Sequence, residues 1–252
     1  MSGHSKWSTI KRQKGVTDAR RGAVFTKAAN AIAIAAKEGG GNPDTNFKLR
    51  LAIEAAKRLN TPKSNIEKAI ARSSGTLKEK VSLEEVTYEG FAPCGVGVMV
   101  EAVTSNKQRT AQEVRSAFER NGGTLSGPGS VAHLFSQVGE ITIKLEENTD
   151  TDQLFLVAAD AGAEDIETDQ KEATIYSKTS LLEKVKNAVV ASGFEVIETR
   201  ISRKPVSVIK IVDEKTASSI LSLVNKLDDL ADVQKVYANF DVPDEILQKE
   251  AL

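Results

Sequence analysis

The apolar positions in the first third of the chain recur with a helical period. Amphipathic helices are predicted at residues 21–38, 46–59 and 61–72. In the first of them, Phe25, Ile32 and Ala36 repeat at helical spacing, and three glycines follow where a C-cap glycine is expected. Thr61 and Pro62 stand at the start of the third, as an N-cap and a first helical residue. The sequence therefore predicts a helical module, small enough to depend on a neighbouring domain.

After Gly75 the pattern changes to the period of two that is typical of strands. Runs of β-branched residues at 86–91 and 95–104 flank a short turn and predict a hairpin, which a helix follows at 109–120. The glycine-rich loop after that helix fits neither of the common phosphate-loop patterns. Near the C-terminus a strand, a helix and a strand are predicted at residues 206–212, 214–227 and 233–240. These three elements are too few to bury a sheet face alone, so we expect them to pair with the hairpin.

Between these two stretches, strands and helices alternate in a recognisable order. Strands are predicted at residues 139–145, 163–168, 172–177 and 194–203, and helices at 151–161 and 179–192. The order β-α-β-β-α-β is that of the ferredoxin-like fold. The predicted fold class is multidomain α and α+β: an N-terminal helical domain, an α+β middle domain, and a ferredoxin-like domain inserted into the middle one. We expect these domains at residues 1–80, 81–136 with 205–252, and 137–204.

Charge is strongly segregated along the chain. Its 252 residues hold 34 Lys and Arg against 35 Asp and Glu, a formal net charge of -1. Residues 1–80 nevertheless carry 17 basic and 6 acidic side chains, a net of +11, whereas residues 81–252 carry 17 and 29, a net of -12. A basic module suggests a polyanion such as DNA or RNA, because Lys and Arg release counterions from phosphates. The acidic remainder would repel that polyanion and leaves room for a basic protein partner.

A basic arm precedes and enters the first predicted helix. Its candidates for phosphate contact are Lys6, Lys11, Arg12, Lys14, Arg20, Arg21 and Lys27. Trp7 is the only tryptophan of the chain, and its place beside Lys6 suits stacking on a base next to a phosphate contact. The alternative is that Trp7 pins the arm onto the helices behind it. In the middle domain, Lys107 and Arg109 start a helix directly after a strand, which fits either a phosphate site or ordinary surface charge.

Little in the sequence supports catalysis, metal binding or membrane insertion. One cysteine excludes an internal disulfide, and with two histidines it cannot supply a Cys/His zinc cage, so neither a metal nor a cofactor is expected. Cys94 and His133 are the single thiol–imidazole candidate, but nothing in their spacing aligns them. No apolar run reaches the roughly 18 residues that a membrane span needs, and the N-terminus lacks the apolar segment of a secretory signal. We therefore expect a cytoplasmic protein with no membrane partner.

Several sequence motifs carry a resemblance to a known family. They are GHSKW-x-x-I-K-x-x-K, RRGAVFTKAANAI-x-x-AAKEGGGNP, TPKSNIEKAIARSSG, YEGFAPCGVGVMVE and TSNKQRTAQEVRSAFERNGG-x-L-x-GPGSVAHLF. Together they closely resemble the YebC/PmpR family, which includes the mitochondrial translational activator of cytochrome oxidase subunit I. The match is dense through about residue 140 and thinner afterwards, where the length and order of the elements continue to fit.

This resemblance implies the same three-domain architecture that the pattern of elements predicts. By similarity, Lys6, Trp7, Lys11, Arg12 and Lys14 occupy the basic opening motif of the family, and Asn106, Lys107 and Arg109 its middle-domain motif. The family is described as probable transcriptional regulators that bind DNA, and its members are also linked to translation at the ribosome. Neither motif distinguishes DNA from RNA.

The sequence thus predicts a non-enzymatic, nucleic-acid-binding regulator of gene expression. The first hypothesis is a DNA-binding transcriptional regulator with weak sequence selectivity, because the basic residues are mostly lysines or lie on an arm. The alternative is a ribosome-associated translation factor that binds ribosomal RNA, for which an arm with Trp7 among lysines is well suited. An enzyme would depend on Cys94 and His133 alone.

Overall fold

The computed structural model of the protein describes residue 7 and residues 18–73, 83–169, 171–243 and 245–247, without the side chains of 18–21 and 73. Its contacts divide the chain into two compact units. One unit is Phe135–Val206, and the other combines the chain up to Leu134 with the chain from Ser207 onward. This division into two units does not test the predicted boundaries of three domains, which remain a prediction.

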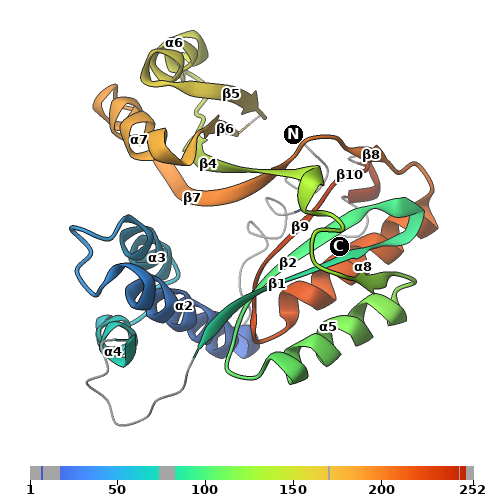
Figure 1. Ribbon diagram of the computed structural model, residues 1–252. Helices are drawn as coiled ribbons and strands as arrows, with labels where there is room; N and C mark the ends of the chain where they lie inside the picture. The colour runs from blue at the N-terminus through green and yellow to red at the C-terminus, as the bar shows by residue number, and fades with distance from the viewer. Residues whose placement is uncertain (1–6, 8–17, 74–82, 170, 244, 248–252) are drawn as a thin grey trace. The chain divides into compact units, whose positions relative to one another are not determined.

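In its described residues, the basic first part of the chain forms the three predicted helices (Figure 1). They are α2 (Asp18–Gly39), α3 (Phe47–Arg58) and α4 (Lys63–Ser73). All three contribute to one apolar cluster, which includes Ile32, Ala35, Leu49, Ala56, Ile66 and Ala69. The predicted side-chain cap at Thr61 is wrong: its hydroxyl is buried without a hydrogen-bond partner in the described structure. The carbonyl of Pro62 instead accepts the first backbone N–H groups of α4.

One buried amide joins α2 to α3. The Asn46 side chain, 6% exposed, donates through Nδ2 to the carbonyls of Ala35 (2.7 Å) and Gly40 (2.8 Å). Its Oδ1 accepts from the backbone N–H of Leu49 at 3.1 Å, which caps α3. A side chain at Gly39 would meet this amide, since an added Cβ would lie 2.6 Å from Nδ2. The amide therefore satisfies backbone groups of both helices, and the glycine turn makes room for it.

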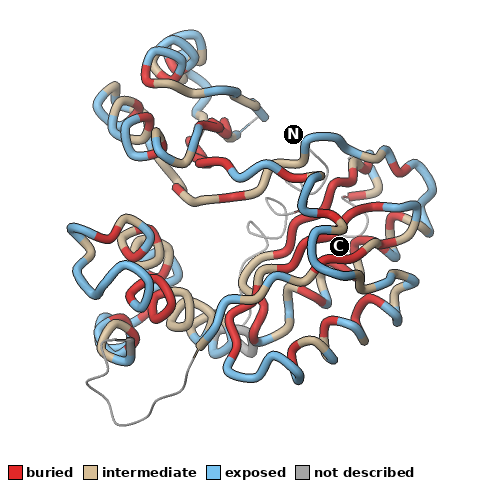
Figure 2. The backbone as a smooth tube through the Cα atoms, viewed as in Figure 1, coloured by how far each residue is buried: buried red, intermediate tan, exposed pale blue. Residues whose placement is uncertain are grey.

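The middle of the chain builds a four-stranded antiparallel sheet. Its strands are β1 (Glu84–Phe91), β2 (Gly97–Thr104), β3 (Thr124–Ser126) and β9 (Val233–Ala238), in the order β3-β1-β2-β9. Helices α5 (Lys107–Arg120) and α8 (Glu214–Asp229) pack their apolar sides on one face, and buried and exposed residues alternate along both (Figure 2). The pairing of β9 with β2 confirms that the C-terminal elements join the hairpin.

The C-terminal strands differ from their prediction in two ways. The strand predicted at 206–212 is reduced to β8 (Ile209–Lys210), and the one predicted at 233–240 is divided into β9 and β10 (Phe240–Asp241). Strand β8 pairs in parallel with β10 in a separate two-stranded sheet. The interruption lies at Asn239, whose Oδ1 accepts from Gly97 N (2.7 Å) and whose own N–H donates to the Gly97 carbonyl. The chain then turns from the main sheet toward β8.

The unit Phe135–Val206 has the predicted β-α-β-β-α-β order. It comprises β4 (Phe135–Lys144), α6 (Thr151–Ala161), β5 (Ala163–Thr168), β6 (Glu172–Ser177), a short 3₁₀ turn (Thr179–Leu181), α7 (Leu182–Ala191) and β7 (Val196–Pro205). The sheet order is β5-β6-β4-β7, with every neighbouring pair antiparallel. This is the ferredoxin-like topology, so the predicted fold class is confirmed.

The ferredoxin-like sheet buries apolar residues on its helix side and polar residues on its other face. Ile141 and Ile175 are fully buried on the helix side, while the alternate register positions carry charged and aromatic side chains. On that other face the Lys204 ammonium lies 3.9 Å from the ring centroid of Tyr176 and pairs with Asp165 (2.5 Å) and Glu167 (3.0 Å). The ammonium group therefore covers the aromatic ring and is itself held by two carboxylates.

Replacing Asn46 with alanine should destabilise the helical part. The variant leaves buried backbone groups of α2 and α3 without their partners, and we expect the free energy of unfolding to fall by about 1–3 kcal/mol. Chemical denaturation followed by circular dichroism measures this change. Asn42→Ala is the matched control, because its side chain caps only an exposed N–H, that of Asp44. Equal losses in both variants would contradict the structural role of Asn46.

Candidate nucleic-acid interface

The structure describes only part of the predicted basic site. Lys6, Lys11, Arg12 and Lys14 lie outside the described residues. Arg20 and Arg21 lie on the first turn of α2, but their side chains are outside the described part. Among the predicted site residues, the structure describes the side chains of Trp7, Lys27, Lys107 and Arg109. The nucleic-acid contacts of the arm therefore stay a prediction.

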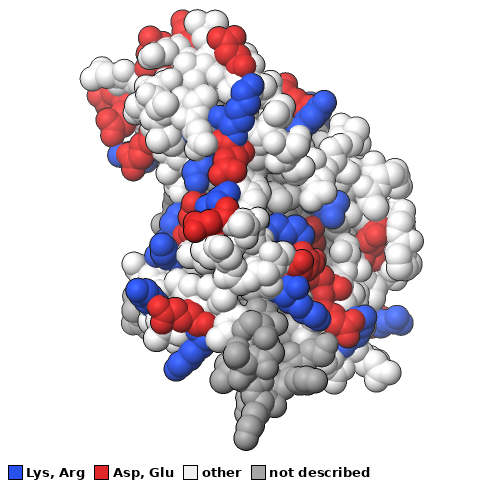
Figure 3. All heavy atoms as spheres, turned by 60° about the vertical axis from the view of Figure 1, so that its left-hand side comes forward, with Lys and Arg blue, Asp and Glu red and all other residues white. Residues whose placement is uncertain are grey.

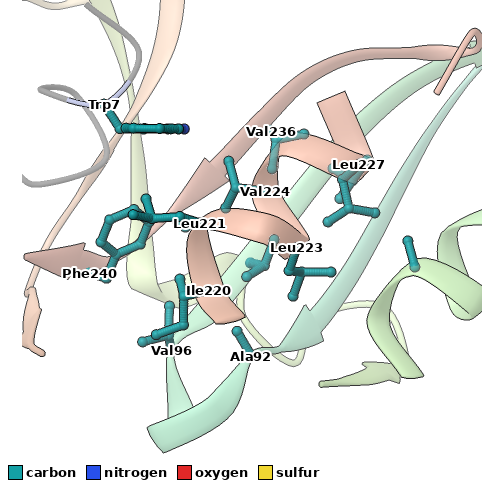
Figure 4. Close-up of a cluster of buried hydrophobic side chains, with 14 of the residues drawn as sticks. Trp7, Ala92, Val96, Ile220, Leu221, Leu223, Val224, Leu227, Val236 and Phe240 are labelled. Atoms are coloured by element: carbon teal, nitrogen blue, oxygen red, sulfur yellow. The ribbon is translucent and has the colours of Figure 1, made fainter. Parts of the chain in front are cut away.

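Trp7 is buried against helix α8. Its side chain is 5% exposed and belongs to the apolar cluster that includes Leu221, Val224 and Phe240 (Figure 4). The indole Nε1 donates to Oδ1 of Asn225 at 3.2 Å. The burial favours the anchoring interpretation, but the support is α8, which packs on the sheet β3-β1-β2-β9, instead of the neighbouring helices. In this arrangement the indole offers no free face on which a base could stack.

Lys27 brings a second contact to the same helix. Its ammonium donates to the carbonyl of Asp228, in the last turn of α8. A cation at this end of a helix is favoured by the partial negative charge of the unsatisfied carbonyls. Trp7 and Lys27 thus both contact α8, and Lys27 is engaged within the protein.

Lys107 and Arg109 lie in the first turn of α5, which Asn106 caps through a hydrogen bond to the backbone N–H of Arg109 (3.1 Å). The Lys107 ammonium pairs with Glu84 of β1 at 2.5 Å. This contact lowers the pKa of the Glu84 carboxyl, by its hydrogen bond first and its charge second. Arg109 donates to Oδ2 of Asp232 at 2.6 Å.

Asp232 is the centre of a buried hydrogen-bond network. Its Oδ2 also accepts from the hydroxyls of Thr110 (2.7 Å) and Thr104 (2.9 Å). Burial alone would raise the pKa of Asp232, but the hydrogen bonds from Thr110, Arg109 and Thr104 outweigh it and lower the pKa below its usual range. The carboxylate therefore joins β2 and α5 to the turn that precedes β9. A phosphate at Lys107 and Arg109 would have to compete with carboxylates that are already in place.

The glycine-rich loop after β3 also has its donors occupied. The Glu89 carboxylate, 6% exposed as a residue, accepts from the backbone N–H groups of Gly129 (2.8 Å), Val131 (2.7 Å) and Ala132 (2.9 Å). These donors would otherwise resemble an anion-binding nest. An internal carboxylate fills the position that a phosphate would take.

The structure brings no catalytic pair together at Cys94 and His133. Cys94 is exposed, with a left-handed backbone (φ 60°) in the turn between β1 and β2, and His133 is exposed in a 3₁₀ turn before β4. No hydrogen bond joins these two described side chains. Across the described residues, no group of three or more His, Cys, Asp and Glu side chains is arranged to hold a metal ion. No helix in the described part is long and apolar enough to cross a membrane.

Three exposed cations of the helical part are not among the candidate site residues predicted from the sequence. Lys57 lies in the last turn of α3, and Lys68 and Arg72 lie on α4. The helical period of α4 could have predicted Lys68 and Arg72, because both lie on the side of the helix away from the buried Ile66 and Ala69. Figure 3 shows basic and acidic side chains intermixed on the face that it displays. The density of positive charge on that face therefore does not identify a binding site, and the contacts of each cation have to be compared instead.

The geometry defines the class of the protein: a helical basic module followed by two antiparallel α+β sheets, of which the ferredoxin-like one is inserted into the other. The family model described as the TACO1/YebC protein N-terminal domain matches residues 5–76. The model for the TACO1/YebC second and third domain matches residues 83–240. The chain therefore belongs to the TACO1/YebC family.

Individual relatives match over nearly their whole length. A protein of Dictyoglomus thermophilum is 48% identical over 248 residues, which are 98% of this chain and 99% of the relative. A protein of Herpetosiphon aurantiacus is 48% identical over 251 residues, 100% of this chain and 99% of the relative. Both are named "Probable transcriptional regulatory protein". The crystal structure of the conserved hypothetical protein Aq1575 from Aquifex aeolicus has a TM-score of 0.82 at 41% identity, covering 90% of this chain and 92% of that one.

The anchoring of Trp7 can be measured directly, because it is the only tryptophan. We expect its fluorescence emission to be blue-shifted and poorly quenched by acrylamide in the native protein, and red-shifted after denaturation. In Leu221→Ala, which opens the apolar surface beside the indole, quenching should increase. Native emission typical of a water-exposed indole would contradict the burial.

Asp232→Asn should lower stability in a pH-dependent way. At neutral pH we expect a loss of about 1–3 kcal/mol in the free energy of unfolding, because the charged hydrogen bonds of a buried network are weakened. Since the folded pKa is lowered, the contribution of the carboxylate is fully present above its unfolded pKa of about 3.9 and is lost as pH falls below it. The difference between wild type and variant should therefore shrink in acid.

Denaturation curves at several pH values measure this difference. Asp160→Asn, a change of the same charge at an exposed position of α6, is the control and should cost little at any pH. A loss for Asp232→Asn that is as small as the control loss at neutral pH would show that the network is dispensable.

Proposed function

We propose that the protein is a non-enzymatic regulator of gene expression that binds DNA through its basic N-terminal part. The observation that carries this proposal is the charge segregation: residues 1–80 have a net charge of +11, and the described part of this stretch forms helices α2 to α4 around one apolar cluster. The names of the relatives, probable transcriptional regulatory proteins, support a role in transcription.

Binding is proposed to depend on phosphates more than on base edges. The basic residues of the arm and of α2 to α4 are mostly lysines, which bind phosphate as point charges, and base readout usually relies on Arg, Asn or Gln side chains in a groove. The acidic remainder keeps the rest of the molecule off the same polyanion. The ferredoxin-like unit, with 14 acidic and 8 basic side chains in residues 135–206, is then available to a basic protein partner.

Ribosomal RNA is the alternative ligand, in a role in translation. A tryptophan among lysines would favour this ligand if its ring could stack on unpaired bases. Because Trp7 is buried on α8, that argument is weaker, and DNA is the better-supported ligand. An enzymatic role has no geometric support at Cys94 and His133, and the proposed site of action is the cytoplasm.

The proposal is tested by binding to duplex DNA over a range of potassium chloride concentrations. Wild type should bind with an affinity that falls steeply with salt, because each neutralised phosphate contributes about 0.9 to the slope of log K against log salt. Changing Lys6, Lys11, Arg12 and Lys14 to Gln should weaken binding and flatten the slope. Affinity independent of salt would contradict the proposal.

The same titration with a structured ribosomal RNA fragment decides between the ligands. Tighter binding to DNA at physiological salt supports the transcriptional role, and tighter binding to RNA favours the translational one. Unchanged regulation in a Cys94→Ala, His133→Ala double variant would exclude the enzyme hypothesis.

A further inference from the structure

The described cations of the helical part divide into two groups. The first group is engaged within the protein: Lys27 with the Asp228 carbonyl, Lys37 with the Leu83 carbonyl (2.9 Å), Lys48 with Glu38 (2.8 Å), Arg50 with the Pro43 carbonyl (3.1 Å) and Lys63 with Glu67 (3.8 Å). Arg58 of α3 is also engaged and belongs to this group. The second group is Lys57, Lys68 and Arg72, which we call the α3–α4 cations. None of the three forms a hydrogen bond or ion pair through its side chain with any residue that the structure describes.

The outward face of α4 presents two of these cations side by side. Ile66 and Ala69 are buried (7% and 2% exposed), which fixes the inward side of the helix. Lys68 and Arg72 are four residues apart and point away from that side, so they are neighbours on the helix surface. The α4 carboxylate, Glu67, is directed toward the flank, where it pairs with Lys63.

We propose that the α3–α4 cations contact the phosphodiester backbone of the bound nucleic acid. This inference rests on the proposed function and assigns phosphate contacts to specific residues of the helical part. A cation with no partner among the described residues can bind a phosphate, and so release its counterions, without giving up a contact in that part of the protein. Lys107 and Arg109 would instead have to leave Glu84 and Asp232. The proposed phosphate contacts therefore lie on α3 and α4, and not at the first turn of α5.

Contacts of this kind hold the nucleic acid without reading its sequence. Exposed Lys and Arg side chains on the outer face of a helix bind phosphate oxygens, and such contacts fix register and orientation but carry no base information. Loss of the α3–α4 cations should therefore weaken binding to all sequences equally. The shared chemistry, a phosphodiester chain, is the same in DNA and RNA.

The test compares two triple variants with the same change in charge. The first is Lys57→Gln, Lys68→Gln, Arg72→Gln. The control is Lys178→Gln, Lys184→Gln, Arg115→Gln, at exposed positions whose side chains also have no described partner. Both remove two Lys and one Arg from the surface, so thermal melting should show that both are folded. A third variant, Lys57→Arg, Lys68→Arg, Arg72→Lys, keeps the charges and should bind like wild type.

Binding of each full-length protein is measured by fluorescence anisotropy against potassium chloride, with a short DNA duplex and with a single-stranded RNA. For the first variant we expect the salt slope to fall by about 2.7 on the duplex and about 2 on the single strand, with at least tenfold weaker binding at low salt. The control should keep the wild-type slope. The polymer that wild type binds more tightly at physiological salt identifies the source of the phosphodiester.

The outcomes separate this inference from the proposed function. If wild type binds with a steep salt dependence and the first variant behaves like the control, the α3–α4 assignment is wrong while the proposed function stands. If the charge-conserving variant loses binding as fully as the glutamine variant, side-chain shape and not charge is responsible, and the assignment is also wrong. If wild type binds neither polymer, the proposed function fails, and this inference fails with it.

Discussion

The packing of helix α8 is the interaction on which the larger unit depends. Its apolar side fills the core beneath the sheet β3-β1-β2-β9, with Ile220, Leu223 and Leu227 fully buried. The same helix also holds two polar contacts: Asn225 accepts a hydrogen bond from Trp7, and the carbonyl of Asp228 accepts one from Lys27. One helix therefore stabilises the middle sheet and holds the N-terminal part against it. A loss of α8 packing would loosen the sheet and the attachment of the basic module together.

Internal carboxylates decide which cations and donors stay available for a ligand. Glu84 and Asp232 pair with the two cations that begin α5, and Glu89 occupies the backbone donors of the glycine-rich loop. A chain with nearly equal numbers of basic and acidic residues can neutralise much of its own charge in this way. Local pairing is thus as important as net charge in locating a binding surface. A paired cation contributes less binding free energy at a phosphate, because it must first give up its carboxylate.

Sequence patterns were sufficient for the elements and insufficient for their long-range contacts. The helical period and the alternation of strands located nearly every long element, since these signals are local. The partner of Trp7 is 218 residues away, so no local pattern could identify α8 as its support. The same reason hides the ion pair of Arg109 with Asp232, which spans 123 residues. Strand β3 was missed because three residues in a glycine-rich loop show no measurable alternation, and β8 was overestimated because apolar residues at 206–212 alternate whether or not they are paired.

Lys204, which covers the ring of Tyr176, distinguishes the ferredoxin-like unit from RNA-recognition domains with a similar sheet. In such domains, aromatic rings on the open sheet face stack against two or three bases. Here the ring is 4% exposed, an ammonium group lies over it, and Asp165 and Glu167 flank that group. A nucleobase would have to displace the ammonium and would then lie beside two carboxylates. Shared topology in this case goes with a sheet face on which the aromatic ring is already covered by a cation of the protein itself.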